Sequence, residues 1–128
     1  MIEPNWLEIE QVEIVQEQII NMTGGMNGIR EKNLLESALF RPKNLYIYEI
    51  NINIYELAAC YAEAVSHNHP FIDGNKRTAF ACSSMFLEDN NLTLSTENQE
   101  EIENIIVDLT EKKITLKEFA IFLQKNSK

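Results

Sequence analysis

The sequence has few of the residues that break or cross-link a chain: 3 prolines, 4 glycines and 2 cysteines in 128 residues. This excludes collagen-like and proline-rich proteins. Cys60 and Cys82 lie far apart in apolar stretches, and we interpret them as small core residues. Apolar runs such as residues 57–61 are far shorter than the roughly 20 residues that span a membrane. No leader segment is visible at the start. We therefore expect a cytoplasmic protein without a membrane partner.

Positive charge is also scarce, because Lys and Arg number 11 against 20 Asp and Glu, for a formal net charge of −9. Nucleic-acid binding usually needs a basic face, so a direct nucleic-acid partner is not expected. Hydrophobic residues make up 45% and charged residues 24%, which is ordinary globular composition. The length is that of one domain, which we assign to residues 1–128.

Apolar residues recur at helical spacing, which predicts an all-α fold. A first helix is expected to start near Trp6 and to end at residues 24–25, two glycines. A shorter helix around residues 34–39 is expected to end at Pro42. Residues 40–54 contain β-type residues without a clear partner strand, and we interpret them as an extended segment or flap.

Residues 55–68 and 76–89 are apolar nearly all round, which predicts two buried central helices in a compact bundle. Two amphipathic helices should follow. Each begins with a capping box, a hydroxyl residue followed three positions later by Gln or Glu: Thr96 with Gln99, and Thr115 with Glu118.

The loop between the two central helices holds most of the chemically versatile side chains. Burying such groups unpaired costs roughly 1–3 kcal/mol each, so the loop should open into a cleft. Pro70 disfavours helix at His69, which places His69 where the first central helix ends. Phe71 is an apolar anchor, and residues 73–74 form a turn.

Asn75 is a good N-cap, which places Lys76 and Arg77 in the first helical turn. Cations there oppose the helix dipole unless an anion binds, so these residues and the free N–H groups predict a phosphate site. Asp73 offers the hard oxygen ligand that Mg²⁺ prefers. His69 is suited to take a proton from a hydroxyl. Together they predict phosphoryl transfer.

Residues 69–79 resemble the signature of the Fic/Doc superfamily in its Doc (death-on-curing) form, His-x-Phe-x-Asp-(Gly or Ala)-Asn-Lys-Arg-Thr-Ala, at every fixed position. The N-terminal half is also similar at residues 24–25, 28–30, 34–39 and 41–42. The resemblance implies a compact Fic/Doc helical fold. It also implies an enzyme that uses ATP and Mg²⁺.

Fic proteins transfer AMP from ATP to a protein hydroxyl, and their signature has a glycine before the motif arginine and a second arginine three residues after it. Lys76 and Phe80 occupy those positions here, as in Doc-type proteins. The resemblance therefore implies a kinase that passes the γ-phosphate to a threonine of the elongation factor that delivers aminoacyl-tRNA. Such a toxin halts translation and is held by an antitoxin protein.

The resemblance assigns His69 as the base and Asp73 as the residue that positions Mg²⁺ or the nucleophile. It assigns phosphate contacts to the residues that follow the turn, Gly74, Asn75, Lys76 and Arg77, and a structural role to Phe71. It identifies residues 40–48 with the flap that docks the target. Two alternatives stay open: an AMP transferase, and a catalytically silent binding module.

Overall fold

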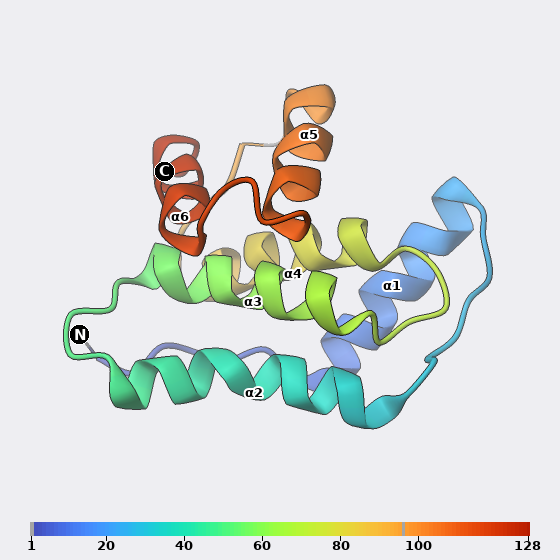
Figure 1. Cartoon of the computed structure of the whole chain (residues 1–128), viewed down its shortest axis with the longest axis horizontal. Coiled ribbons are helices and arrows are strands. Elements are labelled where there is room, and N and C mark those ends of the chain that lie inside the picture. The colour runs from blue at the N-terminus through green and yellow to red at the C-terminus, as the bar shows by residue number, and fades with distance from the viewer. Residues whose placement is uncertain (1, 96) are drawn as a thin grey trace.

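The computed structural model describes residues 2–95 and 97–128, and this part of the chain forms six α-helices and no β-strand (Figure 1). The all-α prediction is confirmed. The helices, in chain order, are α1 (Ile9–Thr23), α2 (Lys32–Tyr48), α3 (Ile54–Asn68), α4 (Asn75–Asp89), α5 (Gln99–Thr110) and α6 (Leu116–Lys125).

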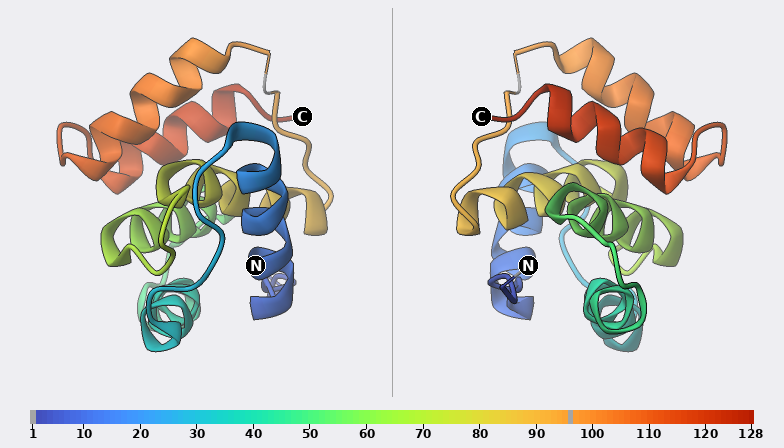
Figure 2. Two further views of the ribbon diagram at one scale, coloured as in Figure 1. Left: turned by 90° about the vertical axis from the view of Figure 1, so that its right-hand side faces the viewer. Right: turned by 90° about the vertical axis from the view of Figure 1, so that its left-hand side faces the viewer.

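The two central helices, α3 and α4, pack against each other, and the remaining helices surround them (Figures 1 and 2). Helix α2 lies on one side of α3, α6 and α5 lie on the other, and α1 packs on α4. Cys60 and Cys82 are buried and unpaired in this core. Burial raises the pKa of Cys60 to about 11 and that of Cys82 to about 12. Both are therefore neutral packing residues, as predicted.

Helix α2 is longer than predicted, because it continues through Pro42 to Tyr48. Proline normally ends a helix by removing one hydrogen bond and crowding the preceding turn. Here Pro42 is buried, and the turns beyond it bring Leu45 and Tyr46 onto the core. Arg41 also forms a 2.8 Å ion pair with Glu63 of α3. Tertiary packing thus outweighs the local preference.

The prediction of an extended segment over residues 40–54 was therefore wrong for residues 40–48. In Figure 1 these residues form the left-hand half of α2, whereas the α3–α4 loop lies at the right-hand end of α3. The segment next to that loop is instead the α1–α2 connection, whose residues Gly28 and Arg30 form backbone hydrogen bonds with the loop.

Capping residues determine where the other helices begin. Helix α1 begins at Ile9 rather than near Trp6, because Glu8 forms its N-cap. The Trp6 ring stacks on Phe86, with ring centroids 5.9 Å apart. Helix α6 begins after Thr115, whose hydroxyl accepts the Glu118 N–H at 3.1 Å, as predicted.

The N-cap of α5 is Asn98, whose side chain accepts the Glu101 N–H at 3.0 Å. The predicted cap, Thr96, lies outside the described residues.

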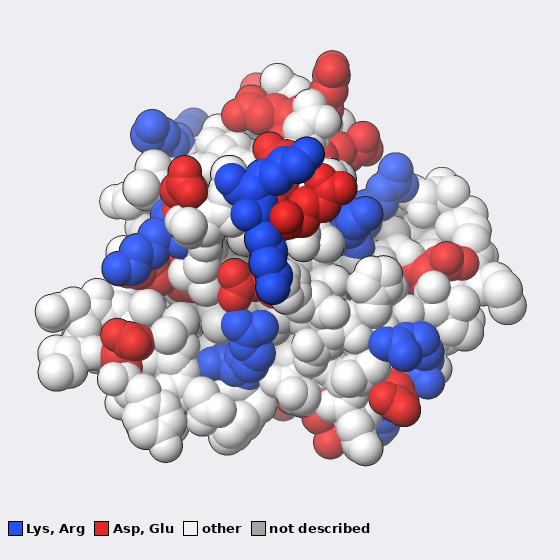
Figure 3. All heavy atoms as spheres, viewed as in Figure 1, with Lys and Arg blue, Asp and Glu red and all other residues white. Residues whose placement is uncertain are grey.

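The surface in Figure 3 has Lys and Arg side chains interspersed with Asp and Glu rather than gathered into one basic area. Within residues 2–95 and 97–128, the helices are too short or too polar to cross a bilayer.

Candidate active site

All the predicted site residues lie in the α3–α4 loop or the first turn of α4. Helix α3 ends at Asn68, and His69 is its C-cap in the left-handed conformation, with φ 49°. The His69 N–H still bonds to the Val65 carbonyl at 3.2 Å. Pro70 then leads the chain away from the helix. The predicted exit at His69 is confirmed, and His69 is exposed to solvent.

The α1–α2 connection supports this loop along its backbone. Ile29 and Phe71 form an antiparallel β-bridge. The Ile72 N–H bonds to the Gly28 carbonyl at 3.1 Å, and the Arg30 N–H bonds to the Pro70 carbonyl at 2.7 Å. Two segments about 40 residues apart in sequence are thereby held in one register.

Arg30 also supports the loop through its side chain. Its Nε donates to the His69 carbonyl at 2.9 Å, and one terminal nitrogen donates to the Asn68 carbonyl at 3.1 Å. These carbonyls end α3, where a cation is favoured by the helix dipole. No role for Arg30 was predicted from the sequence, because nothing in the local sequence pattern links Arg30 to residue 69.

We expect Arg30→Ala to lower the free energy of unfolding by about 1 kcal/mol, since two charge-assisted but exposed hydrogen bonds are lost. Urea unfolding followed by circular dichroism would measure the change. Lys32→Ala is the matched control, because Lys32 is a nearby exposed cation in α2. Equal effects of the two substitutions would contradict the capping role of Arg30.

The loop is anchored to the core by Phe71, which is 1% exposed and belongs to the core cluster. Gln16 of α1 is also buried, and its Nε2 donates to the Asp73 carbonyl at 3.1 Å. Gln16 was not predicted as part of the site. Its burial was predictable from the sequence, because Gln16 lies four residues from both Val12 and Ile20 on the apolar face of α1.

Asn75 is the first residue of α4 rather than its N-cap, which is Gly74 in the left-handed conformation with φ 77°. Asn75 is buried, and its side chain turns back toward the loop. Its Oδ1 accepts the Phe71 N–H at 3.0 Å, and its Nδ2 donates to the Phe71 carbonyl at 3.0 Å. Nδ2 also lies 3.2 Å from Nδ1 of His69. Because the side-chain amide is committed to these contacts, Asn75 can offer a phosphate its backbone N–H.

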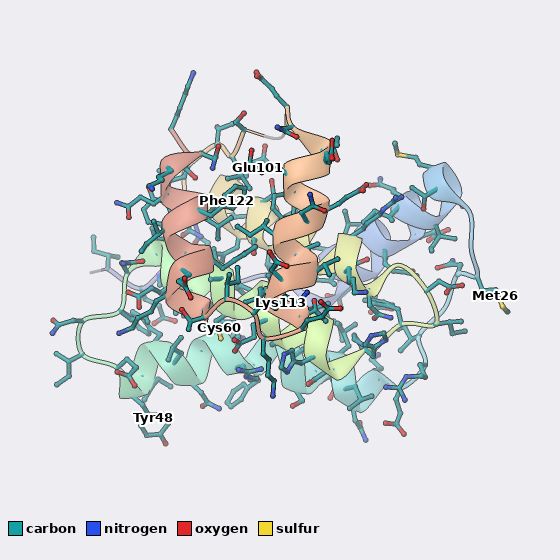
Figure 4. The ribbon with its side chains drawn as sticks, turned by 45° about the horizontal axis from the view of Figure 1, so that its top comes forward. Met26, Tyr48, Cys60, Glu101, Lys113 and Phe122 are labelled. Atoms are coloured by element: carbon teal, nitrogen blue, oxygen red, sulfur yellow. The ribbon has the colours of Figure 1, made fainter. Side chains whose placement is uncertain are left out.

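Asp73 is exposed at the turn, and its Oδ2 accepts the Met26 N–H at 2.8 Å. Met26 lies on the α1–α2 connection at the right-hand edge of Figure 4. Gly25 approaches so closely that an added Cβ would lie 3.3 Å from this carboxylate, at a φ of 107° that favours glycine. Asp73 therefore ties the two segments together.

The side chains of this site do not by themselves supply enough ligands for Mg²⁺. Groups of three or more His, Cys, Asp or Glu that could hold a metal ion do not occur in the described part of the chain. Asp73 would supply one carboxylate, and phosphate oxygens and water would complete the shell, as is usual for Mg²⁺.

A cavity of about 540 Å³ opens beside the loop. It is lined by the end of α1 and by every predicted site residue except the buried Phe71. Residues 75–77 line this cavity, and their N–H groups precede the first intrahelical bond of α4, which Thr78 donates to the Gly74 carbonyl at 2.9 Å. Such unpaired N–H groups attract anions. Lys76 and Arg77 are exposed at this rim.

A second cavity of about 530 Å³ adjoins the first, and Lys76 and Arg77 line both. Helices α1, α4 and α5 form its mainly apolar walls, which include Ile19, Met22, Phe80, Met85, Ile102 and Ile106. Arg77 lies 3.6 Å from Glu103 of α5 across this groove, in an exposed pair of low expected energy.

Comparison with known proteins shows the family of this chain. The curated Toxin Doc of Mycolicibacterium smegmatis (strain ATCC 700084 / mc(2)155) is 33% identical over 75 residues, which cover 58% of this chain and 58% of that toxin. The chain thus spans less than two thirds of the relative that it matches. Residues 6–87, which include the whole loop and its supports from α1 and the α1–α2 connection, match the model of the Fic/DOC family. This chain therefore belongs to the Fic/DOC family.

Proposed function

We propose that this protein is the toxin of a toxin–antitoxin pair and that it phosphorylates a protein. In this proposal it transfers the γ-phosphoryl group of ATP to a threonine of the elongation factor that delivers aminoacyl-tRNA, which stops translation. Membership of the Fic/DOC family, whose members transfer groups to proteins, and the similarity to Toxin Doc support a group-transfer toxin.

The observation that carries the choice of a kinase is the arrangement along α4. Lys76 and Arg77 are adjacent at the shared rim of the two cavities. Phe80, one turn further on, is 8% exposed and packs edge-on against Phe119, with ring centroids 6.5 Å apart. The cations are thus concentrated at the helix start, and the position of a second Fic-type arginine holds an apolar side chain.

The proposed chemistry uses this placement. The N–H groups at the start of α4, with Lys76 and Arg77, would hold the triphosphate and stabilise charge on the transferred group. Asp73 would hold Mg²⁺ beside the phosphates, and the ion would supply positive charge there. His69 would take the proton of the threonine hydroxyl. The threonine oxygen would bond to the γ-phosphorus while the bond between that phosphorus and ADP breaks.

The apolar groove between α1, α4 and α5 is the proposed docking surface for a segment of the antitoxin. Met22, at its edge, is 86% exposed, so the free protein leaves apolar surface uncovered there. A segment that filled the groove would reach Lys76 and Arg77. It could therefore block the triphosphate site.

ATP labelled at either the α- or the γ-phosphate separates the possible functions. Purified elongation factor is incubated with this protein and each form of ATP in turn. We expect label on the elongation factor from γ-labelled ATP alone. Label from the α-phosphate would establish AMP transfer instead, and no label from either would favour a binding module or a different target.

We further expect the Lys76→Gly and Phe80→Arg double substitution to weaken phosphoryl transfer and to produce AMP transfer. Catalysis of this kind depends on the position of the phosphates and on the charges around them. Moving a cation along α4 should therefore change which phosphate of ATP faces the target hydroxyl. Lys76→Gly alone should give weak AMP transfer at best. Mass spectrometry of the target would detect the added group, with circular dichroism to check folding.

The double variant could instead keep wild-type phosphorylation and add no AMP. In that case Lys76 and Phe80 would not determine which phosphate is transferred.

A further inference from the structure

The Asn75 side chain has only one consistent orientation in the loop. Its Oδ1 lies 3.0 Å from the Phe71 nitrogen and its Nδ2 lies 3.0 Å from the Phe71 oxygen. Exchanging the two ends would place a donor against a donor and an acceptor against an acceptor. The backbone of Phe71, held by the bridge to Ile29, therefore determines which end of the amide faces His69.

The end that faces His69 is the nitrogen, 3.2 Å from Nδ1 of the imidazole. An amide NH₂ group donates two hydrogen bonds and accepts none. One of its hydrogens is directed to the Phe71 carbonyl, which leaves the second for His69. Nδ1 must then accept, so it carries no hydrogen. A neutral imidazole that accepts at Nδ1 has its hydrogen on Nε2.

We infer that Asn75 is a positioning residue that holds the resting His69 in the tautomer protonated at Nε2. Asn75 is 5% exposed, so water does not compete freely for its side-chain amide. By contrast, His69 is exposed at the loop surface. The Asn75 amide is accordingly the group that orders the ring.

This tautomer affects how His69 can work as a base, a consequence that rests on the proposed function. The electron pair at Nδ1 points toward Asn75. The other nitrogen, Nε2, already carries a hydrogen. A substrate proton can be accepted at Nδ1 only if Asn75 withdraws, and at Nε2 only if the hydrogen moves to Nδ1. Either route breaks the contact between Asn75 and His69, so its loss accompanies the catalytic step.

The tautomer can be measured without any turnover. Uniformly ¹⁵N-labelled protein at a pH where both imidazoles are neutral gives long-range ¹H–¹⁵N correlations that identify the protonated nitrogen. The chain has only 2 histidines, and His67→Gln assigns their signals. We expect His69 to be protonated at Nε2 alone. His67, exposed at the end of α3, should average both tautomers.

Asn75→Asp is the decisive variant. One carboxylate oxygen can still accept the Phe71 N–H, and the other now faces Nδ1 as an acceptor, which favours hydrogen on Nδ1. That second oxygen can no longer donate to the Phe71 carbonyl, so the variant loses one loop hydrogen bond and some stability. We expect the protonated nitrogen of His69 to change from Nε2 to Nδ1, with the backbone amide spectrum showing a retained fold.

An Nδ1–H signal for His69 in the wild type would overturn the inference, as would an unchanged tautomer in a folded Asn75→Asp protein. If that variant does not fold, the wild-type spectrum decides, because an average of tautomers like that of His67 would also overturn it. A failure of phosphoryl transfer would alter none of these spectra. The inference and the proposed function therefore fail separately.

Discussion

Replacing His69 with alanine should lower the rate of phosphoryl transfer by about 10²–10⁴-fold, the usual contribution of a general base. The fold should survive, because the side chain is exposed and the backbone of the loop is held by its own contacts to Gly28 and Arg30. The rate is measured as transfer to the elongation factor under single-turnover conditions, and the fold by circular dichroism.

Two further variants give this experiment its controls. His67→Ala removes the neighbouring exposed histidine, two residues earlier in the last turn of α3, and should leave the rate close to wild type. His69→Asn removes the base but keeps a residue type that accepts the left-handed conformation at this position. An unaltered rate in a folded His69→Ala protein would remove His69 from the mechanism. An inactive His67→Ala protein would show that the loss of activity is not specific to His69.

Phe71→Ala should have the largest effect on stability, a loss of about 3–5 kcal/mol in the free energy of unfolding. The ring is 1% exposed, so its removal leaves a cavity in the core beneath the loop. A domain with an ordinary stability of about 5–15 kcal/mol would lose a large part of it. Urea unfolding measures the difference, and activity should fall with the folded fraction.

Ile72→Ala is the matched control for this substitution. Ile72 is the next residue in the same loop, but it is 45% exposed, so its truncation should change the unfolding free energy by less than about 1 kcal/mol. Phe71→Leu, which keeps most of the apolar volume, should lie between the two. Equal effects of Phe71→Ala and Ile72→Ala would show that the loop does not depend on its apolar anchor.

The sequence predicted the structure best where a residue type strongly favours one local conformation or environment. The apolar central helices, the exit of α3 before Pro70 and the capping box of Thr115 with Glu118 follow from local chemistry, and the structure confirms each. The concentration of polar groups between two apolar helices likewise identified the segment that lines the cavity. Local patterns suffice here because each signal acts within a few residues.

The features that sequence reasoning missed depend on contacts between distant segments. Pro42 is compatible with α2 because the helix packs on α3, a gain that propensity does not include. Arg30 lies 39 residues before His69, and the two residues are in contact because the backbones of the two loops are paired. Asn75 was expected to cap α4, but its side chain bonds to Phe71 and His69 instead.

The mass of the elongation factor after incubation with unlabelled ATP, Mg²⁺ and this protein tests the proposed kinase most directly. We predict a gain of one phosphoryl group, located on a threonine by fragmentation, in the presence of wild-type protein and not of His69→Ala. A gain of one AMP, or an unchanged mass with folded wild-type protein, would contradict the assignment of this Fic/DOC protein as a kinase of that factor.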